Sequence, residues 1–410
     1  MADFTQYGNA TAEWLAVTDS RPPMDPSLSL KEMQRITNMH RENLAQSELK
    51  RLGNPEIHMK DYTITTRDGF SLEARTYRPP TSDNNARLPI YIHLHGGGYV
   101  FGNIASEDAI CTAIAIGANV TVVNVNYRHA PDFAYPTAWE DTEDAFHWIH
   151  DHIDELLGVP TQVLVGGISA GAQLSAALTL RQNISPDGLS RPKLAGQVLM
   201  IPALVHPECY APILEQIKDP SLSSYVQNAN APLLGKAELD KFTSLLKVQN
   251  PDPKDVRLNI GHASTDQVKG MPPTTLGISG LDPFRDEGLL YGKKLAEAGV
   301  PTDIHIFSGL PHGFRRFGDQ LSETSSAASN ITVILKNPSD ILPSHSPSQT
   351  ISLINVAPVR HLPTDAHPSI LGRRQRQSLN LEAQRDDTYQ PQQLRIRKFS
   401  PWTKMFSAPE

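Results

Sequence analysis

The sequence predicts an α/β protein with a mostly parallel central sheet and helices on both faces. Two observations favour this class: short apolar runs rich in β-branched residues alternate with helix-like segments, and glycine-rich turns follow several of the runs. A chain of 410 residues, 39% hydrophobic and 20% charged, can bury a substantial core. Its formal charge of −7 argues against nucleic acid or an anionic membrane as the main partner.

The first segment, residues 1–56, is polar with helical stretches. Leu30, Met33, Ile36 and Met39 recur at helical spacing and predict a helix within 28–51. Strand-like runs follow at 57–66 and 72–77, with Asp68-Gly69 between them as a hairpin signal, and the apolar run 88–94 leads into a glycine-rich loop.

A regular alternation of strands and helices follows. Strands are predicted at 120–125, 162–166, 197–201, 274–279 and 303–307, and helices at 137–150, 170–180 and 286–298. Residues about 205–265 interrupt this order, since they hold several prolines and a helix-like piece at 237–248 but no clear strand. We interpret them as a helical cap inserted into a domain that spans 57–336.

The last segment, 337–410, is rich in Pro, Ser, Gln and Arg and has few clustered apolar residues. It cannot bury enough surface to offset the entropy of ordering, so disorder is predicted. Arg373, Arg374 and Arg376 form a small basic cluster, which we interpret as a solvated charge run.

The pentapeptide Gly167-Ile168-Ser169-Ala170-Gly171 lies between an apolar strand and a helix. This is the context of a nucleophile elbow, a sharp turn that needs small neighbours and exposes a reactive serine. The amides at the start of the following helix favour a developing oxyanion. Ser169 is therefore the candidate nucleophile.

A second motif, His95-Gly96-Gly97-Gly98, follows the run 88–94. Consecutive glycines let successive backbone N–H groups point at a substrate, as the oxyanion of an acyl-transfer intermediate requires. We predict Gly97, Gly98 and Ala170, the residue after the nucleophile, as the three donors. A merely flexible glycine turn is the alternative.

A nucleophilic serine needs a base, and the base needs an orienting acid. His312 lies directly after the last predicted strand, and Asp282 follows the strand 274–279. The order Ser169, Asp282, His312 is that of an α/β-hydrolase triad. Asp282, which precedes a proline and a helix, is also suited to a helix N-cap, and Asp286 is the acid that would then replace it.

Other reactive residues receive a structural interpretation. Cys111 and Cys209 are far apart and predicted to be reduced and buried. The histidines 147, 150 and 152 lack a carboxylate–histidine motif, so a solvated helix end is favoured over a metal site.

Together these motifs, with Tyr127-Arg128-His129-Ala130-Pro131, resemble the hormone-sensitive-lipase-like, fold-3 branch of the α/β-hydrolases over residues 57–320. The resemblance implies an α/β-hydrolase fold in which the N-terminal helices and the 205–265 insertion cover the substrate pockets. The chain departs from the family pattern at Ile168, where an acidic residue is usual, at Ala172-Gln173, and at His129, where leucine is usual. More weakly, the chain resembles fungal esterases of small-molecule biosynthesis.

These observations predict a serine hydrolase that cleaves a small, short-acyl carboxylic ester without a metal or organic cofactor. The short-acyl preference rests on the lack of an evident large apolar lid. An acyltransferase or dehydratase on the same fold, or a non-catalytic small-molecule receptor, are the alternatives; retention of His312 argues against the receptor. With no signal peptide and no apolar run long enough for a bilayer, a cytoplasmic location is expected, and a homodimer stays open.

Overall fold

The computed structural model describes residues 1–17, 25, 27–83, 85–185, 190–322 and 395–398. These belong to the first of two compact units, Met1–Leu342 with Gln392–Glu410; the second, Pro343–Pro391, lies outside the described residues. The predicted disordered tail 337–410 also lies outside them, apart from one short strand, and the predicted domain division stays a prediction.

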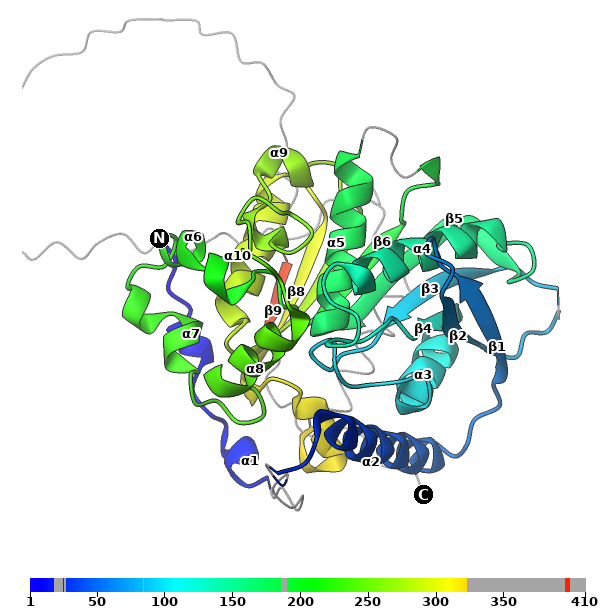
Figure 1. Ribbon diagram of the computed structural model, residues 1–410, viewed down its shortest axis with the longest axis horizontal. Helices are drawn as coiled ribbons and strands as arrows, with labels where there is room; N and C mark the ends of the chain where they lie inside the picture. The colour runs from blue at the N-terminus through cyan, green and yellow to red at the C-terminus, as the bar shows by residue number, and fades with distance from the viewer. Residues whose placement is uncertain (18–24, 26, 84, 186–189, 323–394, 399–410) are drawn as a thin grey trace, which may run out of the picture. The chain divides into compact units, whose positions relative to one another are not determined.

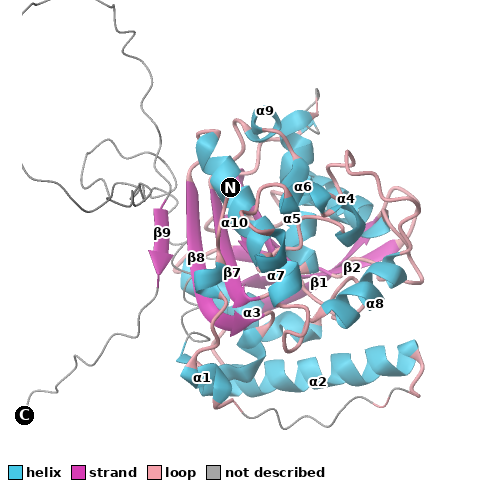
Figure 2. Cartoon of the chain, turned by 90° about the vertical axis from the view of Figure 1, so that its left-hand side faces the viewer, coloured by secondary structure: helices cyan, strands magenta, loops and turns pink. Residues whose placement is uncertain are grey.

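The described strands form one sheet in the order β1-β2-β4-β3-β5-β6-β7-β8-β9 (Figures 1 and 2). β1 and β2 are an antiparallel hairpin, β2 pairs antiparallel with β4, and every later pairing is parallel. The bounds are β1 His58–Thr65, β2 Ser71–Arg78, β3 Leu88–Leu94, β4 Thr121–Val125, β5 Gly158–Ile168, β6 Gly196–Met200, β7 Thr274–Leu281, β8 Thr302–Pro311 and β9 Arg395–Lys398.

Most predicted helices are found close to their expected bounds. The α-helices are α1 Ala12–Leu15, α2 Leu30–Arg51, α3 Asp108–Ala118, α4 Thr137–Asp151, α5 Ala170–Ile184, α6 Ala211–Leu214, α7 Ser224–Gln227, α8 Lys236–Leu246, α9 Thr265–Val268 and α10 Arg285–Glu297. The helix α3 was not among those expected. Residues 205–265 contain short helices and no strand that belongs to the sheet, as expected for this interval.

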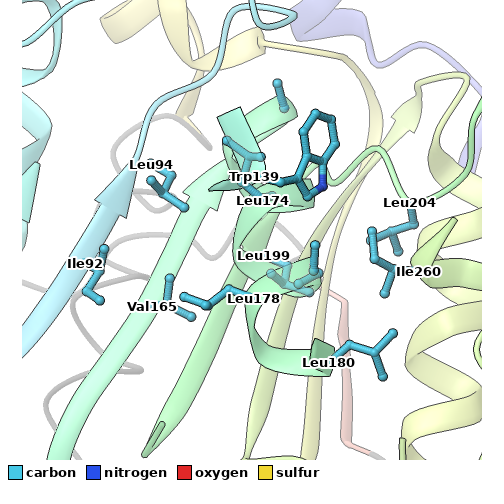
Figure 3. Packing of buried hydrophobic residues seen from close by; sticks show 14 of the residues in the cluster. Ile92, Leu94, Trp139, Val165, Leu174, Leu178, Leu180, Leu199, Leu204 and Ile260 are labelled. Carbon is cyan, nitrogen blue, oxygen red and sulfur yellow. The ribbon is translucent and has the colours of Figure 1, made fainter. Parts of the chain in front are cut away.

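Two apolar clusters lie on opposite faces of the sheet, because neighbouring strand residues point to opposite sides. In β3, Ile90 and Ile92 join the cluster under α4, α5 and α10, whereas Tyr91 joins the one under α3 and the 3₁₀ segment Phe314–Gln320. Figure 3 shows the first cluster, in which Trp139 of α4 lies beside Leu174 of α5 above strand residues such as Val165. Cys111 and Cys209 are both buried and unpaired.

Helix α2 does not belong to either cluster as a buried core helix. It lies at one end of the sheet (Figure 1), and Ala45 is its one buried residue. Met39 and Leu44 are 46% and 39% exposed, so apolar burial alone does not hold this helix. Among the described residues, no helix is both long enough and apolar enough to cross a membrane.

Candidate active site

Ser169 lies where β5 ends and α5 begins. Its backbone has φ of 55° and ψ of −115°, a conformation that residues other than glycine rarely adopt. The turn is tight enough to require its glycines. A Cβ on Gly171 would lie 2.0 Å from the carbonyl oxygen of Leu94, and one on Gly167 would lie 2.5 Å from the same oxygen. The small residues of the pentapeptide are therefore needed for close packing of the elbow against β3.

The structure brings His312 and Asp282 to Ser169 in a continuous hydrogen-bonded chain. His312 Nε2 lies 2.8 Å from Ser169 Oγ, and His312 Nδ1 lies 2.7 Å from Asp282 Oδ2. The side chain of Asp282 is 1% exposed, and His312 packs edge-on against the ring of Phe284. Three segments distant in the sequence, each following a strand, thus place one hydroxyl, one imidazole and one carboxylate in line.

The contacts of Asp282 exclude the helix N-cap interpretation of this aspartate. Its Oδ1 accepts a hydrogen bond from the Phe284 amide at 2.9 Å while Oδ2 faces His312. Helix α10 begins at Arg285, so the aspartate forms a turn before the helix rather than its N-cap. Asp286 is turned away, since its carboxylate accepts from the amide of Ser224 and from the Arg285 guanidinium.

The glycine loop after β3 lines the same cavity as Ser169. Gly97 has φ of +136° and Gly98 has φ of +62°, both in the region that favours glycine. A Cβ on Gly97 would lie 2.0 Å from the carbonyl oxygen of Phe101, so the loop closes on itself there. Within the part of the chain that the structure describes, no backbone acceptor takes the N–H of Gly97 or Gly98.

A cavity of about 1840 Å³ opens over these groups. Ser169, His312, Gly97, Gly98 and Ala170 all line it, whereas Asp282 lies buried behind His312. Its walls come mainly from α2, α8 and the 3₁₀ segment after His312, and its apolar side chains include Met33, Ile36 and Leu44 of α2 and Leu239, Phe242 and Leu245 of α8. Ile168 also lines the cavity, so the departure from the acidic family pattern adds apolar surface beside Ser169.

Sequence reasoning missed several residues that hold this arrangement. Asn228, from the 205–265 insertion, donates to the carbonyl oxygen of Asp282 at 3.0 Å. The buried Gln173 contacts the hydroxyl of Tyr99 and donates to the carbonyl oxygen of Leu258 at 2.7 Å, which ties the elbow helix to the glycine loop and to the insertion. Asn228 belongs to no motif, and Gln173 stands out in the sequence only as a departure from the family pattern, which does not indicate these contacts.

The histidines 147, 150 and 152 are not gathered into a site. His147 lies beside Arg191, His150 packs edge-on against Phe146, and His152 stacks on Trp148. Within the described ranges, no group of three or more His, Cys, Asp or Glu side chains is placed to hold a metal ion.

Comparison with known proteins identifies the family. A model of the alpha/beta hydrolase fold matches residues 91–316. The chain is 30% identical over 312 residues to the carboxylesterase NlhH of Mycobacterium tuberculosis, covering 73% of this chain and 91% of that protein, and 30% identical over 255 residues to the versiconal hemiacetal acetate esterase of Dothistroma septosporum, covering 61% and 73%. A crystal structure of vibralactone cyclase superposes with a TM-score of 0.70 at 26% identity, over 82% of this chain and 97% of that one.

The chain therefore belongs to the α/β-hydrolase fold family, and within it to the esterase class of enzymes. The hormone-sensitive-lipase-like branch inferred from the motifs is confirmed, as is the likeness to a fungal esterase.

Proposed function

We propose that this protein hydrolyses a carboxylic ester with Ser169 as nucleophile, His312 as general base and acid, and Asp282 as the group that orients the imidazole. The observation that carries this proposal is the unbroken chain from Ser169 Oγ through His312 to Asp282 at the floor of a substrate-sized cavity.

In the proposed reaction, Ser169 Oγ attacks the ester carbonyl carbon while its proton passes to His312 Nε2. The N–H groups of Gly97, Gly98 and Ala170 stabilise the oxyanion of the tetrahedral intermediate. Its collapse releases the alcohol, which takes the proton from His312, and leaves an acyl-Ser169. Water then gives its proton to His312, attacks the acyl carbon, and releases the acid as the serine regains its proton.

We further propose that residues 1–56 and 205–265 act as the cap of a hydrolase domain spanning 57–336. Side chains of α2 and α8 line the cavity from these two segments. The apolar wall that they build was not evident in the sequence. The short-acyl prediction, which rested on the lack of a large apolar lid, therefore loses that argument.

A short acyl group nevertheless stays our proposal, because one relative is named for an acetate ester of a larger alcohol and another for ethyl acetate. An acetyl group would need only a small part of the cavity of about 1840 Å³ and would leave room for a larger alcohol part.

The test compares the wild type with Ser169→Ala on p-nitrophenyl esters from C2 to C12. The variant should lose about 10⁵- to 10⁶-fold in kcat on every ester, because it lacks the attacking oxygen. Activity of Ser169→Ala close to that of the wild type would overturn the nucleophile assignment. A wild-type optimum at C10 or longer would overturn the short-acyl proposal alone.

A further inference from the structure

One face of α2 is joined to the glycine loop by hydrogen bonds rather than by apolar packing. Gln34 donates to the carbonyl oxygen of Val100 at 3.0 Å, and Asn38 accepts from the amide of Gly102 at 2.8 Å. Arg41 donates to the carbonyl oxygen of Gly96, and Glu42 accepts from the Asn103 amide group at 2.6 Å. These four residues follow a spacing of four, three and one, which places them on one side of a helix.

Arg41 makes the contact that lies closest to the proposed oxyanion donors. Its Nη1 donates to the carbonyl oxygen of Gly96 at 2.9 Å, and its Nη2 donates to Glu107 Oε1 at 2.7 Å. A Cβ built on Gly97 would lie 3.0 Å from the same Nη1, so the guanidinium lies directly against the loop. The Arg41 side chain is only 24% exposed.

Glu107 fixes the position of that guanidinium. Its carboxylate is buried and lies 3.0 Å from His93 Nε2 on β3, so the arginine is tied both to the loop and to the sheet. Burial of Glu107 opposes its ionisation, but the His93 hydrogen bond and the charge of Arg41 outweigh it and hold the Glu107 pKa below its ordinary value. Arg41 and Glu107 therefore form an ion pair in which both side chains are charged.

The carbonyl that Arg41 contacts belongs to the same peptide group as the N–H of Gly97. A cation that donates to the carbonyl oxygen draws electron density from the amide nitrogen, and hydrogen bonds polarise one another along such a chain. The N–H at the other end of the peptide then becomes a stronger donor, and its direction is fixed.

We propose that Arg41 is a positioning residue for the oxyanion hole, one that orients and polarises the Gly96–Gly97 peptide from a helix outside the sheet. This inference rests on the proposed function, because it takes the N–H of Gly97 as an oxyanion donor. It differs from a simple role in attaching the cap, which would affect substrate binding and stability but not the stabilisation of a tetrahedral intermediate.

The experiment compares Arg41→Met and Arg41→Lys with the wild type on p-nitrophenyl acetate. Arg41→Met should lower kcat by about 10- to 100-fold, less than the loss of a whole donor, with KM changed by no more than about threefold. Affinity for a trifluoromethyl ketone, which forms a tetrahedral adduct with the serine, should fall by the same factor as kcat/KM. Arg41→Lys keeps a cation and should recover part of both losses.

Two further variants make the result interpretable. Arg35→Met removes an exposed arginine of the same helix, which pairs with Glu32, and should leave kcat and inhibitor affinity unchanged. The double variant Arg41→Met/Glu107→Gln removes the buried carboxylate charge together with its partner, and it tests the same effect if Arg41→Met alone does not fold.

A folded Arg41→Met or double variant with wild-type kcat and inhibitor affinity would overturn the inference. A change in KM with kcat unchanged would also overturn it, because that result identifies a cap attachment. Neither result touches the proposed function, because Ser169→Ala and Asp282→Asn test that proposal separately.

Discussion

Ser169, His312 and Asp282 stand just beyond the carboxyl ends of three strands of one sheet, whereas the glycine loop opposite them is held by a helix from outside that sheet. The first group follows β5, β8 and β7, so strand register and turn geometry place its atoms within hydrogen-bond distance. The loop follows β3, but its carbonyl groups at Gly96 and Val100 accept hydrogen bonds from α2. The proposed reaction needs both the three residues and the loop. It therefore depends on the sheet for the first and on α2 for the second.

On our proposals, the helix α2 has two roles: it covers the cavity, and it holds the loop that stabilises the oxyanion. The α2 helix contributes Met33 and Ile36 to the cavity wall and Arg41 to the loop beneath it. Substitution of His312 or Asp282, which follow strands of the sheet, should lower kcat by impairing proton transfer. Changes in the helix-held loop should act through oxyanion stabilisation.

Among the residues that position the reacting groups, Asp282 is expected to have the largest effect on kcat. Asp282→Asn should lower kcat by about 10⁴-fold, because an amide cannot hold the His312 tautomer that accepts the serine proton. The KM for p-nitrophenyl acetate should change little. Steady-state kinetics at pH 7 to 9 measure both constants.

Asp286→Asn is the matched control for this change. Asp286 is equally buried and only four residues away, but it pairs with Arg285 and accepts from Ser224. Its replacement should reduce the free energy of unfolding and leave kcat within about tenfold of the wild type. The triad assignment would be wrong if Asp286→Asn, and not Asp282→Asn, gave the 10⁴-fold loss.

On the other side of the comparison, Gly97→Ala should lower kcat by about 10²- to 10³-fold, or about 2.7–4 kcal/mol of transition-state stabilisation. The new methyl group would meet the Phe101 carbonyl oxygen at 2.0 Å, so the loop has to move and the N–H turns away. Gly69→Ala is the control, since Gly69 also has positive φ, at +80°, but its Cβ would meet nothing within 4 Å. An unchanged kcat in Gly97→Ala would exclude Gly97 as a donor.

The same contrast explains how far sequence alone could predict this molecule. The elbow at Ser169, the glycine loop and the position of His312 after β8 follow from local rules of turn geometry and chain order, and the structure brings them together as expected. The roles of Asn228 and Gln173 could not be predicted, because each depends on which distant carbonyl lies within reach. For α2, the apolar periodicity predicted the helix correctly. It did not indicate that the polar face with Asn38 and Arg41 contacts the glycine loop.

The smallest expected effect concerns the underside of the glycine loop, where His95 stacks on Tyr127 and packs edge-on against His129. Burial lowers the pKa of His95 to about 3, aided by His129 and Arg41 against the pull of Glu107, and burial together with Arg41 lowers the pKa of His129 to about 4. Both imidazoles are neutral at neutral pH. His129 Nε2 has no hydrogen-bond partner among the described residues, which makes it a buried polar atom without compensation.

His129→Leu should therefore stabilise the protein by about 1 kcal/mol at pH 7 and reduce its sensitivity to acid. Below pH 6.5 the unfolded chain takes up a proton at residue 129 that the folded chain does not bind until about pH 4, so the free energy of unfolding falls across this window. One such histidine accounts for at most about 1.4 kcal/mol per pH unit. Urea unfolding at pH 7.0, 6.0 and 5.0 measures the slope, with the exposed histidine variant His58→Leu as control. A slope in His129→Leu as steep as that of the wild type would show that acid does not act on the protein through His129.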